Sequence, residues 1–332
     1  MMMNARPWAA LFAVASALAA LLPSVQAERG PDSYLFTYFT KNGEDGLHLT
    51  WSRDGYTWMP LRDGGSFLAP NVGQSKLMRD PCVVRGPDGT YRMVWTAGWS
   101  ENDIGYASTR DFIHWSEEKS IPVMAHEPTV LNTWAPEVHY DSERHEFMIF
   151  WASTIPGRFP STEGSSVSSA DLARSSGYNH RIYFTTTRDF TTFAPTKLLY
   201  DPGFNVIDAT FLHANGRHYL IVKDETLRPV PRKYLQIAEG DDMHGPFSKL
   251  SAPITPPGLW SEGPTAIKIG RDYLVYFDAY RAKYYGAVRS RDLVKWEDVT
   301  GQMKFPFEGT PVRMRHGTII AVPESVVARL RP

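Results

Sequence analysis

The sequence contains almost no cysteine, which limits how the fold can be stabilised. Cys82 is the only cysteine among 332 residues, so no disulfide can form within the chain. Long basic tracts are also absent and the formal net charge is −1. This balance argues against a nucleic-acid partner, because such binding depends on clustered Lys and Arg. Stability must therefore come from the packing of a large core, for which 42% hydrophobic residues are sufficient.

Only one segment of the chain is apolar enough to suggest contact with a membrane, and it lies at the N-terminus. A basic start at Arg6 precedes an apolar run over residues 9–22, and small residues follow at positions 25–27. This run is shorter than the roughly 20 residues that a membrane-spanning helix needs. The pattern is typical of a cleaved secretory signal. We therefore expect residues 1–27 to be a signal peptide and residues 28–332 to be one domain, without a membrane span, that is secreted or periplasmic.

A short motif recurs along the chain and indicates a repeated architecture. Each copy is an Asp that follows Arg and precedes an aromatic residue by four positions; the copies are Asp54, Asp111, Asp189 and Asp292. Strand-like segments lie beside each copy. The last interval is about twice the others, so we expect one further sheet, with an edge over residues 235–247, that lacks the motif. Such a repeat predicts successive small β-sheets.

A second series gives the number of sheets. Five short strands begin with a polar residue, at Asp80, Glu137, Asp208, Glu262 and His316. The first four each lead, after a turn, to an aromatic-rich strand. No strand follows the fifth, so we expect its partner at the other end of the chain, over residues 34–38. We therefore predict an all-β, five-bladed β-propeller whose ring is closed by a C-terminal strand, about 312–322, that completes the N-terminal blade. The longest interval, between Glu137 and Asp208, indicates a surface insertion over residues 160–176.

The five starting residues are expected to meet around one axis, because the first strand of each propeller blade lines the centre. Four carboxyl groups and one imidazole in one cavity are costly, since like charges repel and burial disfavours the charged forms. Function explains this cost better than folding does. The structural alternative is that each carboxylate caps a turn or pairs with an arginine such as Arg79 or Arg315. Closely spaced carboxyl groups suit glycoside hydrolysis, in which one donates a proton and an ionised partner activates water.

The motifs around these residues resemble those of glycoside hydrolase family 43, whose members are five-bladed propellers that cleave furanosides and xylosides with inversion. The resemblance spans essentially the whole chain after the signal segment. It rests on Arg79-Asp80-Pro81, Trp134-Ala135-Pro136-Glu137, Ile207-Asp208, Glu262-Gly263-Pro264 and Arg315-His316-Gly317. One departure is Glu137, where the family frequently has Asp.

The resemblance implies a role for each residue of the axis. Asp80 would be the general base that deprotonates water, and Glu262 would be the general acid. Asp208 would hydrogen-bond to Glu262, orient it and raise its pKa by like charge. His316 would lie beside an axial metal ion such as calcium or a water cluster, although a lone His is more often a hydrogen-bonded structural group. No cofactor is expected to be required.

Further residues are candidates for contact with the sugar. They are Arg79, Trp95, Trp134, Glu137, Lys223, Tyr280 and Arg315. The aromatic members are candidate walls for the sugar ring, with core packing as the alternative. Lys223, Asp224 and Glu225 end an inner strand and either contact sugar hydroxyls or pair with each other.

The function expected from the sequence is an inverting glycosidase that releases terminal arabinofuranose, galactofuranose or xylose from plant or microbial polysaccharides. We expect a monomer whose only partner is the oligo- or polysaccharide. One alternative is a retaining enzyme similar to invertase, but no Asn-Asp-Pro segment precedes Arg79. A sialidase is another, since residues 52–58 approximate an Asp-box turn, yet no arginine triad is identifiable. A third is a glycan-binding propeller without catalysis.

Overall fold

The computed structural model describes Met1 and residues 33–163 and 177–331. The expected signal segment 1–27, apart from Met1, and most of the expected insertion at 160–176 lie outside the described residues. In the part of the chain that is described, no helix is both long and apolar enough to cross a membrane.

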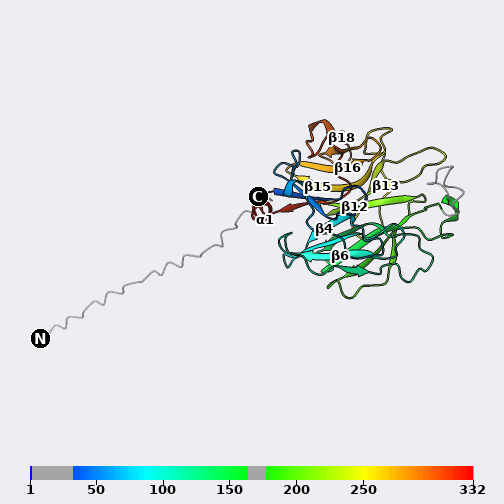
Figure 1. Ribbon diagram of the computed structural model, residues 1–332, viewed down its shortest axis with the longest axis horizontal. Helices are drawn as coiled ribbons and strands as arrows, with labels where there is room; N and C mark the ends of the chain where they lie inside the picture. The colour runs from blue at the N-terminus through cyan, green and yellow to red at the C-terminus, as the bar shows by residue number, and fades with distance from the viewer. Residues whose placement is uncertain (2–32, 164–176, 332) are drawn as a thin grey trace. The chain divides into compact units, whose positions relative to one another are not determined.

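Antiparallel strands form five small sheets, and each sheet is one blade of a β-propeller (Figure 1). Blade I contains β1 (Ser33–Tyr38), β2 (His48–Ser52), β3 (Met59–Pro60) and β19 (Ile319–Val322). Blade II contains β4 (Arg79–Arg85), β5 (Tyr91–Thr96), β6 (Ile104–Thr109) and β7 (Lys119–Ile121). Blade III contains β8 (Trp134–Asp141), β9 (Glu146–Ser153), β10 (Arg181–Thr187) and β11 (Lys197–Tyr200).

The remaining two blades differ in size. Blade IV has three strands, β12 (Val206–Ala214), β13 (Arg217–Asp224) and β14 (Leu235–Gly240). Blade V has four, β15 (Glu262–Ile269), β16 (Asp272–Ala279), β17 (Tyr284–Ser290) and β18 (Glu297–Asp298). Short 3₁₀ helices occur at η1 (Arg62–Gly64), η2 (Pro160–Thr162) and η3 (Thr300–Gln302).

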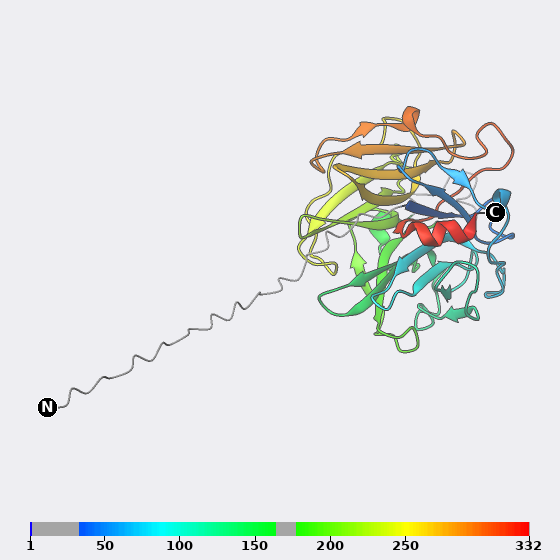
Figure 2. The ribbon, with the colours of Figure 1, turned by 90° about the vertical axis from the view of Figure 1, so that its left-hand side faces the viewer.

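The blades close into a ring, which confirms the predicted fold. The innermost strands β4, β8, β12, β15 and β19 contact one another in cyclic order. Figure 2 shows the blades around a common centre, from blue through cyan, green and yellow to orange. β19 pairs antiparallel with β1, with Leu35 opposite Ile320. This closing strand is shorter than predicted because its pairing becomes irregular before Ile319: Thr37 N–H donates to Thr318 O and Arg315 N–H to Phe39 O, both at 3.0 Å, with an extra residue between them.

The recurring Asp motif caps the turn that leads to the outer edge of each blade. In blade I, Asp54 Oδ1 accepts hydrogen bonds from the backbone N–H groups of Tyr56 (2.7 Å) and Thr57 (2.8 Å). The other three copies make the same pair of bonds. Blade IV has a reduced version, in which Asp242 Oδ1 accepts from the N–H of His244 (2.8 Å). The blade expected to lack the motif therefore keeps its capping carboxylate and loses the Arg and the aromatic residue.

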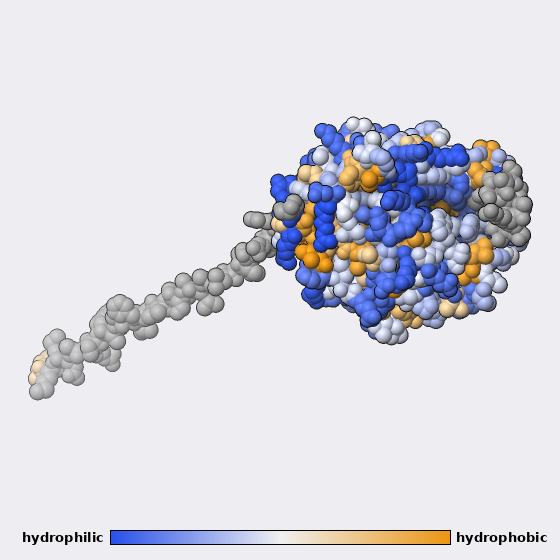
Figure 3. Space-filling model, viewed as in Figure 1, coloured by the Kyte–Doolittle hydropathy of each residue, from blue (hydrophilic) through white to orange (hydrophobic). Residues whose placement is uncertain are grey.

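The core lies between neighbouring blades, so the middle strands are buried on both faces. In β9, every residue from Phe147 to Ser153 is buried. The C-terminal helix α1 (Glu324–Leu330), which the sequence did not predict, packs Val326 and Val327 against blade I. In the view of Figure 3, hydrophilic and hydrophobic residues are mixed over the described surface.

Candidate active site

An irregularity at the start of each innermost strand positions the candidate catalytic residues. In blades II to V the pairing shifts by one residue at this point, and the first of the two residues inside the shift has a positive φ. These residues are Asp80 (φ 52°), Ala135 (48°), Asp208 (52°) and Gly263 (57°). A bulge re-aims side chains, and non-glycine residues adopt positive φ only where the surroundings hold them. The local strain thus directs Asp80 and Asp208 into the pocket at the axis.

Asp80 forms a charged pair with His316. Its Oδ1 lies 3.3 Å from His316 Nδ1, and its Oδ2 accepts a hydrogen bond from the Thr96 hydroxyl (2.8 Å). Burial opposes ionisation of Asp80, but the hydrogen bond and charge of His316 outweigh it and lower the pKa of Asp80 to about 2. In turn, Asp80 overcomes the burial of the imidazole and raises the pKa of His316 to about 9. The lowered pKa favours the ionised carboxylate of Asp80, which is the form that a general base requires.

Asp208 holds a proton more readily than Asp80 or Glu262 does. Burial raises its pKa to about 6, and the negative charges of Glu262 and Asp80 act in the same direction. Asp208 Oδ2 accepts a hydrogen bond from the backbone N–H of Gly263 (3.0 Å), which fixes it beside the residue that follows Glu262. This corrects the expected hydrogen bond between Asp208 and Glu262, because the partner of Asp208 is the backbone of the residue that follows Glu262.

Glu262 lies between two cations. Lys223 Nζ is 3.1 Å from its Oε2, and Arg315 Nη2 is 2.9 Å from its Oε1. Burial alone would raise the pKa of Glu262, but Lys223 and Arg315 outweigh it and lower the pKa. This is a correction to the expectation that Asp208 raises the pKa of Glu262, because the two cations are in direct contact with the carboxylate.

The two cations, Lys223 and Arg315, also form ion pairs with a second set of carboxylates. Lys223 Nζ lies 2.7 Å from Glu225 Oε2, and Arg315 Nε lies 2.8 Å from Asp278 Oδ2. Asp278 is opposite Glu262 in the pairing of β15 with β16 and is completely buried. Burial and the charge of Glu262 raise the pKa of Asp278 to about 6. The sequence motifs do not indicate Asp278, which is the last residue but one of β16, the strand that pairs with the Glu262 strand.

One pocket of about 240 Å³ receives most of the predicted residues. Its lining includes Arg79, Asp80, Trp134, Asp208, Lys223, Glu262, Tyr280, Arg315 and His316, together with Trp99, Ile207 and Glu225. Trp99 was not predicted. Its exposed ring stacks with Arg79, whose guanidinium carbon is 4.3 Å from the ring centroid, and its position just after an aromatic-rich inner strand was the available signal.

Two predicted sugar contacts lie elsewhere. Trp95 is fully buried in the core, where a Cβ on Gly105 would collide with its indole ring, so the alternative of core packing is correct for this residue. Glu137 is 2% exposed and does not line the pocket. Its Oε2 instead accepts a hydrogen bond from Thr210 (2.8 Å) and lies 2.9 Å from His139 Nε2. Asp224, at the end of β13, is likewise buried and pairs with Arg232 (3.2 Å).

The metal ion that the resemblance suggested beside His316 stays a prediction. His316 Nδ1 lies 3.3 Å from Asp80 Oδ1, so Nε2 is the ring nitrogen that would face such an ion. Among the described residues, no group of three or more His, Cys, Asp or Glu side chains is arranged to hold a metal ion.

Comparison with known proteins places the chain in a family. A family model described as a probable glycosyl hydrolase domain, of the type related to glycoside hydrolase family 43, matches residues 31–326. The chain belongs to this family. This family 43-related protein is 23% identical to an α-L-arabinofuranosidase of Bifidobacterium longum subsp. longum over 91% of its own length, and it spans about a third (34%) of that relative. Its fold is similar to that of an α-L-arabinofuranosidase from Lactobacillus brevis, with a TM-score of 0.51, 16% identity and coverage of 67% of this chain and 72% of that one.

Proposed function

We propose that this protein is a glycosidase that removes single terminal sugars by an inverting mechanism. Arabinofuranose is the first candidate for the sugar, and galactofuranose and xylose follow. The observation that carries the proposal is the convergence of Asp80, Asp208 and Glu262, from three blades, on one small pocket. A volume of about 240 Å³ is below the roughly 300–1,000 Å³ of pockets for drug-sized ligands, so it suits one sugar residue rather than a chain. The arabinofuranosidase relatives support arabinose as the first candidate.

The mechanism assigns opposite protonation states to two carboxyl groups. Asp80, held ionised by His316, would take a proton from a water molecule as that water attacks the anomeric carbon. Glu262 would give a proton to the departing glycosidic oxygen. Because Lys223 and Arg315 favour the ionised form of Glu262, the sugar must weaken at least one of these contacts when it binds. Lys223 has an alternative partner in Glu225, towards which it can shift.

The experiment is hydrolysis of nitrophenyl arabinofuranoside, galactofuranoside and xyloside, followed by NMR of the sugar first released. We expect turnover of at least one substrate, with the anomeric configuration inverted. Release with retained configuration would assign Asp80 or Glu262 as a nucleophile instead. Binding of glycans without any turnover would indicate the non-catalytic alternative.

We also propose that the protein acts outside the cytoplasm, where polysaccharide is available, and that it does so as a monomer. The signal-like pattern of residues 1–27 supports the first of these two points. N-terminal sequencing and sedimentation of the protein recovered from its native host test both points. A retained N-terminus would reject the first, and a dimer would reject the second.

A further inference from the structure

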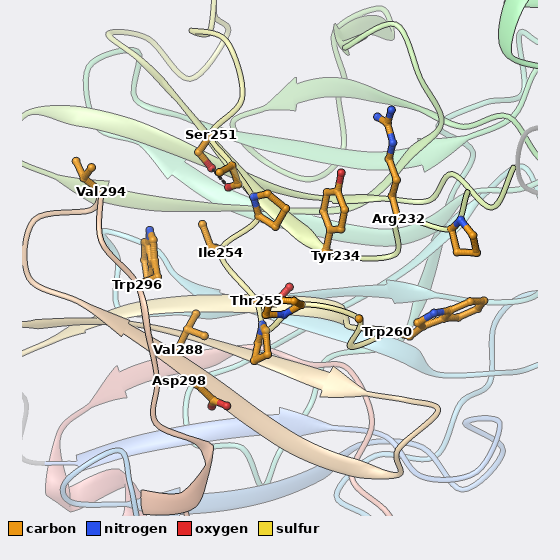
Figure 4. A pocket seen from close by; sticks show the side chains of 16 residues that line it. Arg232, Tyr234, Ser251, Ile254, Thr255, Trp260, Val288, Val294, Trp296 and Asp298 are labelled. Atoms are coloured by element: carbon orange, nitrogen blue, oxygen red, sulfur yellow. Dashed lines mark hydrogen bonds between the residues drawn. The ribbon is translucent and has the colours of Figure 1, made fainter. Parts of the chain in front are cut away.

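A larger cavity than the candidate active site lies between the outer parts of blades IV and V (Figure 4). Its volume is about 670 Å³. It exists because blade IV lacks a regular fourth strand, and an irregular segment takes that place: the N–H of Ile254 donates to Leu235 O and that of Ser251 donates to Ile237 O, both at 2.9 Å. Pro253 and the two prolines that follow cannot donate to a strand ladder, so the segment leaves a groove. We refer to this cavity as the blade IV–V groove.

The lining of the blade IV–V groove combines aromatic rings with polar groups. Figure 4 shows Trp260 and Trp296 on opposite sides, with Tyr234 and Thr255 between them. Sugar rings present apolar C–H faces and hydroxyl groups, and such mixed surfaces match them. At the outer end, Val294 also lines the groove and is 79% exposed.

The groove and the candidate active site are adjacent at Trp260, which lines the groove and faces a residue of the small pocket. The Trp260 ring lies 6.0 Å from the ring of Tyr280, which lines the small pocket. A second connection runs through Lys233, whose Nζ is 5.7 Å from the Trp260 centroid and donates to the carbonyl of Glu225 (2.8 Å). The exposed Arg281 lies over the Trp260 ring at 3.7 Å and adds hydrogen-bond donors at this junction.

We propose that the blade IV–V groove binds the glycan chain that carries the terminal sugar. This inference rests on the proposed function, in which the small pocket holds only the sugar to be released. The rest of the chain must leave the pocket past its rim, and the Tyr280–Trp260 junction joins that rim to a groove with aromatic and hydroxyl groups. The substrate class is therefore an oligo- or polysaccharide, and the groove discriminates long chains from short ones.

The test compares a substrate that fills only the pocket with substrates that also reach the groove. We would measure kcat/KM for the nitrophenyl glycoside that is hydrolysed and for oligosaccharides of the same sugar with increasing length. In the unmodified protein, kcat/KM should rise with length. Trp260→Ala and Tyr234→Ala should each lower kcat/KM for the longest oligosaccharide by about tenfold and leave the nitrophenyl glycoside within about twofold. Tyr284→Ala, at an exposed tyrosine outside both cavities, is the matched control and should change neither value.

The outcomes separate failure of the groove from failure of the proposed function. Values that do not depend on length would overturn the groove, as would equal losses on short and long substrates in Tyr234→Ala. If no glycoside is hydrolysed at all, the proposed function fails, and calorimetric titration of the protein with the same oligosaccharides decides the groove alone. Tighter binding of longer chains that Tyr234→Ala abolishes would support it. A dimer in sedimentation experiments that Tyr234→Ala dissociates would instead assign this face to a second copy of the chain.

Discussion

Two rings of side chains surround the propeller axis at positions only two residues apart, and they perform different tasks. The first ring consists of the residues at the bulge, Asp80, Ala135, Asp208, Gly263 and His316. The second ring consists of Cys82, Glu137, Thr210, Thr265 and Thr318. In the first ring, Asp80, Asp208 and His316 line the pocket. In the second, hydrogen bonds join neighbouring blades, as from Thr210 to Glu137 (2.8 Å) and from the N–H of Ile319 to Thr265 (3.0 Å).

The comparison shows that a buried carboxylate at the axis is not by itself a sign of catalysis. Glu137 has two fixed partners on its Oε2, Thr210 and His139, which belong to the structure of blades III and IV. Asp80 also has partners, but it opens onto the pocket and its backbone is held at a positive φ. Access to the pocket therefore distinguishes a candidate catalytic group from a group that ties blades together.

The largest expected effect concerns the first ring. Asp80→Asn keeps the size of the side chain and its contact with Thr96 but removes the charge. We expect kcat to fall by about 10²–10⁴-fold, the range typical of a lost general base. The measurement is turnover of a nitrophenyl glycoside, with the circular dichroism spectrum as the control for folding. A folded variant that keeps more than about a tenth of the activity would exclude Asp80 as the base.

The matching change in the second ring should reverse the pattern. Glu137→Ala leaves the buried hydroxyl of Thr210 and the ring of His139 without their acceptor. We expect the free energy of unfolding to fall by about 3 kcal/mol, while kcat changes by less than about threefold. Urea unfolding and turnover of the same glycoside are the measurements. Unchanged stability with lost turnover would move Glu137 into the catalytic machinery.

The sequence was sufficient for the fold because the signals of a propeller are local. The Asp turn and the alternating strands recur within each blade, and the partner of the closing strand follows from the count. The position within a ring was harder to predict, because a bulge shifts the register by one residue. Glu262 therefore lies one residue before the bulge residue Gly263, and Glu137 lies two residues after the bulge residue Ala135, whereas the sequence pattern predicts that both are equivalent to Asp80.

The electrostatics of the site could not be predicted from motifs, since they depend on contacts between blades. Lys223 is 39 positions before Glu262 in the chain, and only the approach of blade IV to blade V brings the ammonium to 3.1 Å from the carboxylate. The sequence contains one weak indication that Trp95 is buried. It lies opposite Gly105, and a glycine across from a large ring provides room for that ring within a sheet.

The Asp80–His316 pair provides a prediction on stability that again separates the rings. The raised pKa of His316, about 9, means that its contribution to stability is full below its unfolded value of about 6.5 and is lost as the pH rises through 9. We expect unfolding free energy to fall by about 2–3 kcal/mol between about pH 6 and pH 9.5, as measured by urea unfolding. His316→Gln should lack this decrease. An equally steep decrease in that variant would place the titrating group elsewhere.

The smallest expected effect is a displacement of the pH profile, and it tests how the pKa of Glu262, the residue just before the first ring's Gly263, is set. Lys223→Met removes a cation that contacts Glu262 at 3.1 Å, so the pKa of Glu262 should rise. If Glu262 is the acid, its protonated form then persists to higher pH, and the high-pH limb of kcat/KM should move upward. Lys233→Met is the matched control, because its ammonium contacts Glu225 rather than Glu262, and it should move the limb less. A limb that moves downward in Lys223→Met, or equally in both variants, would show that this limb does not report on Glu262.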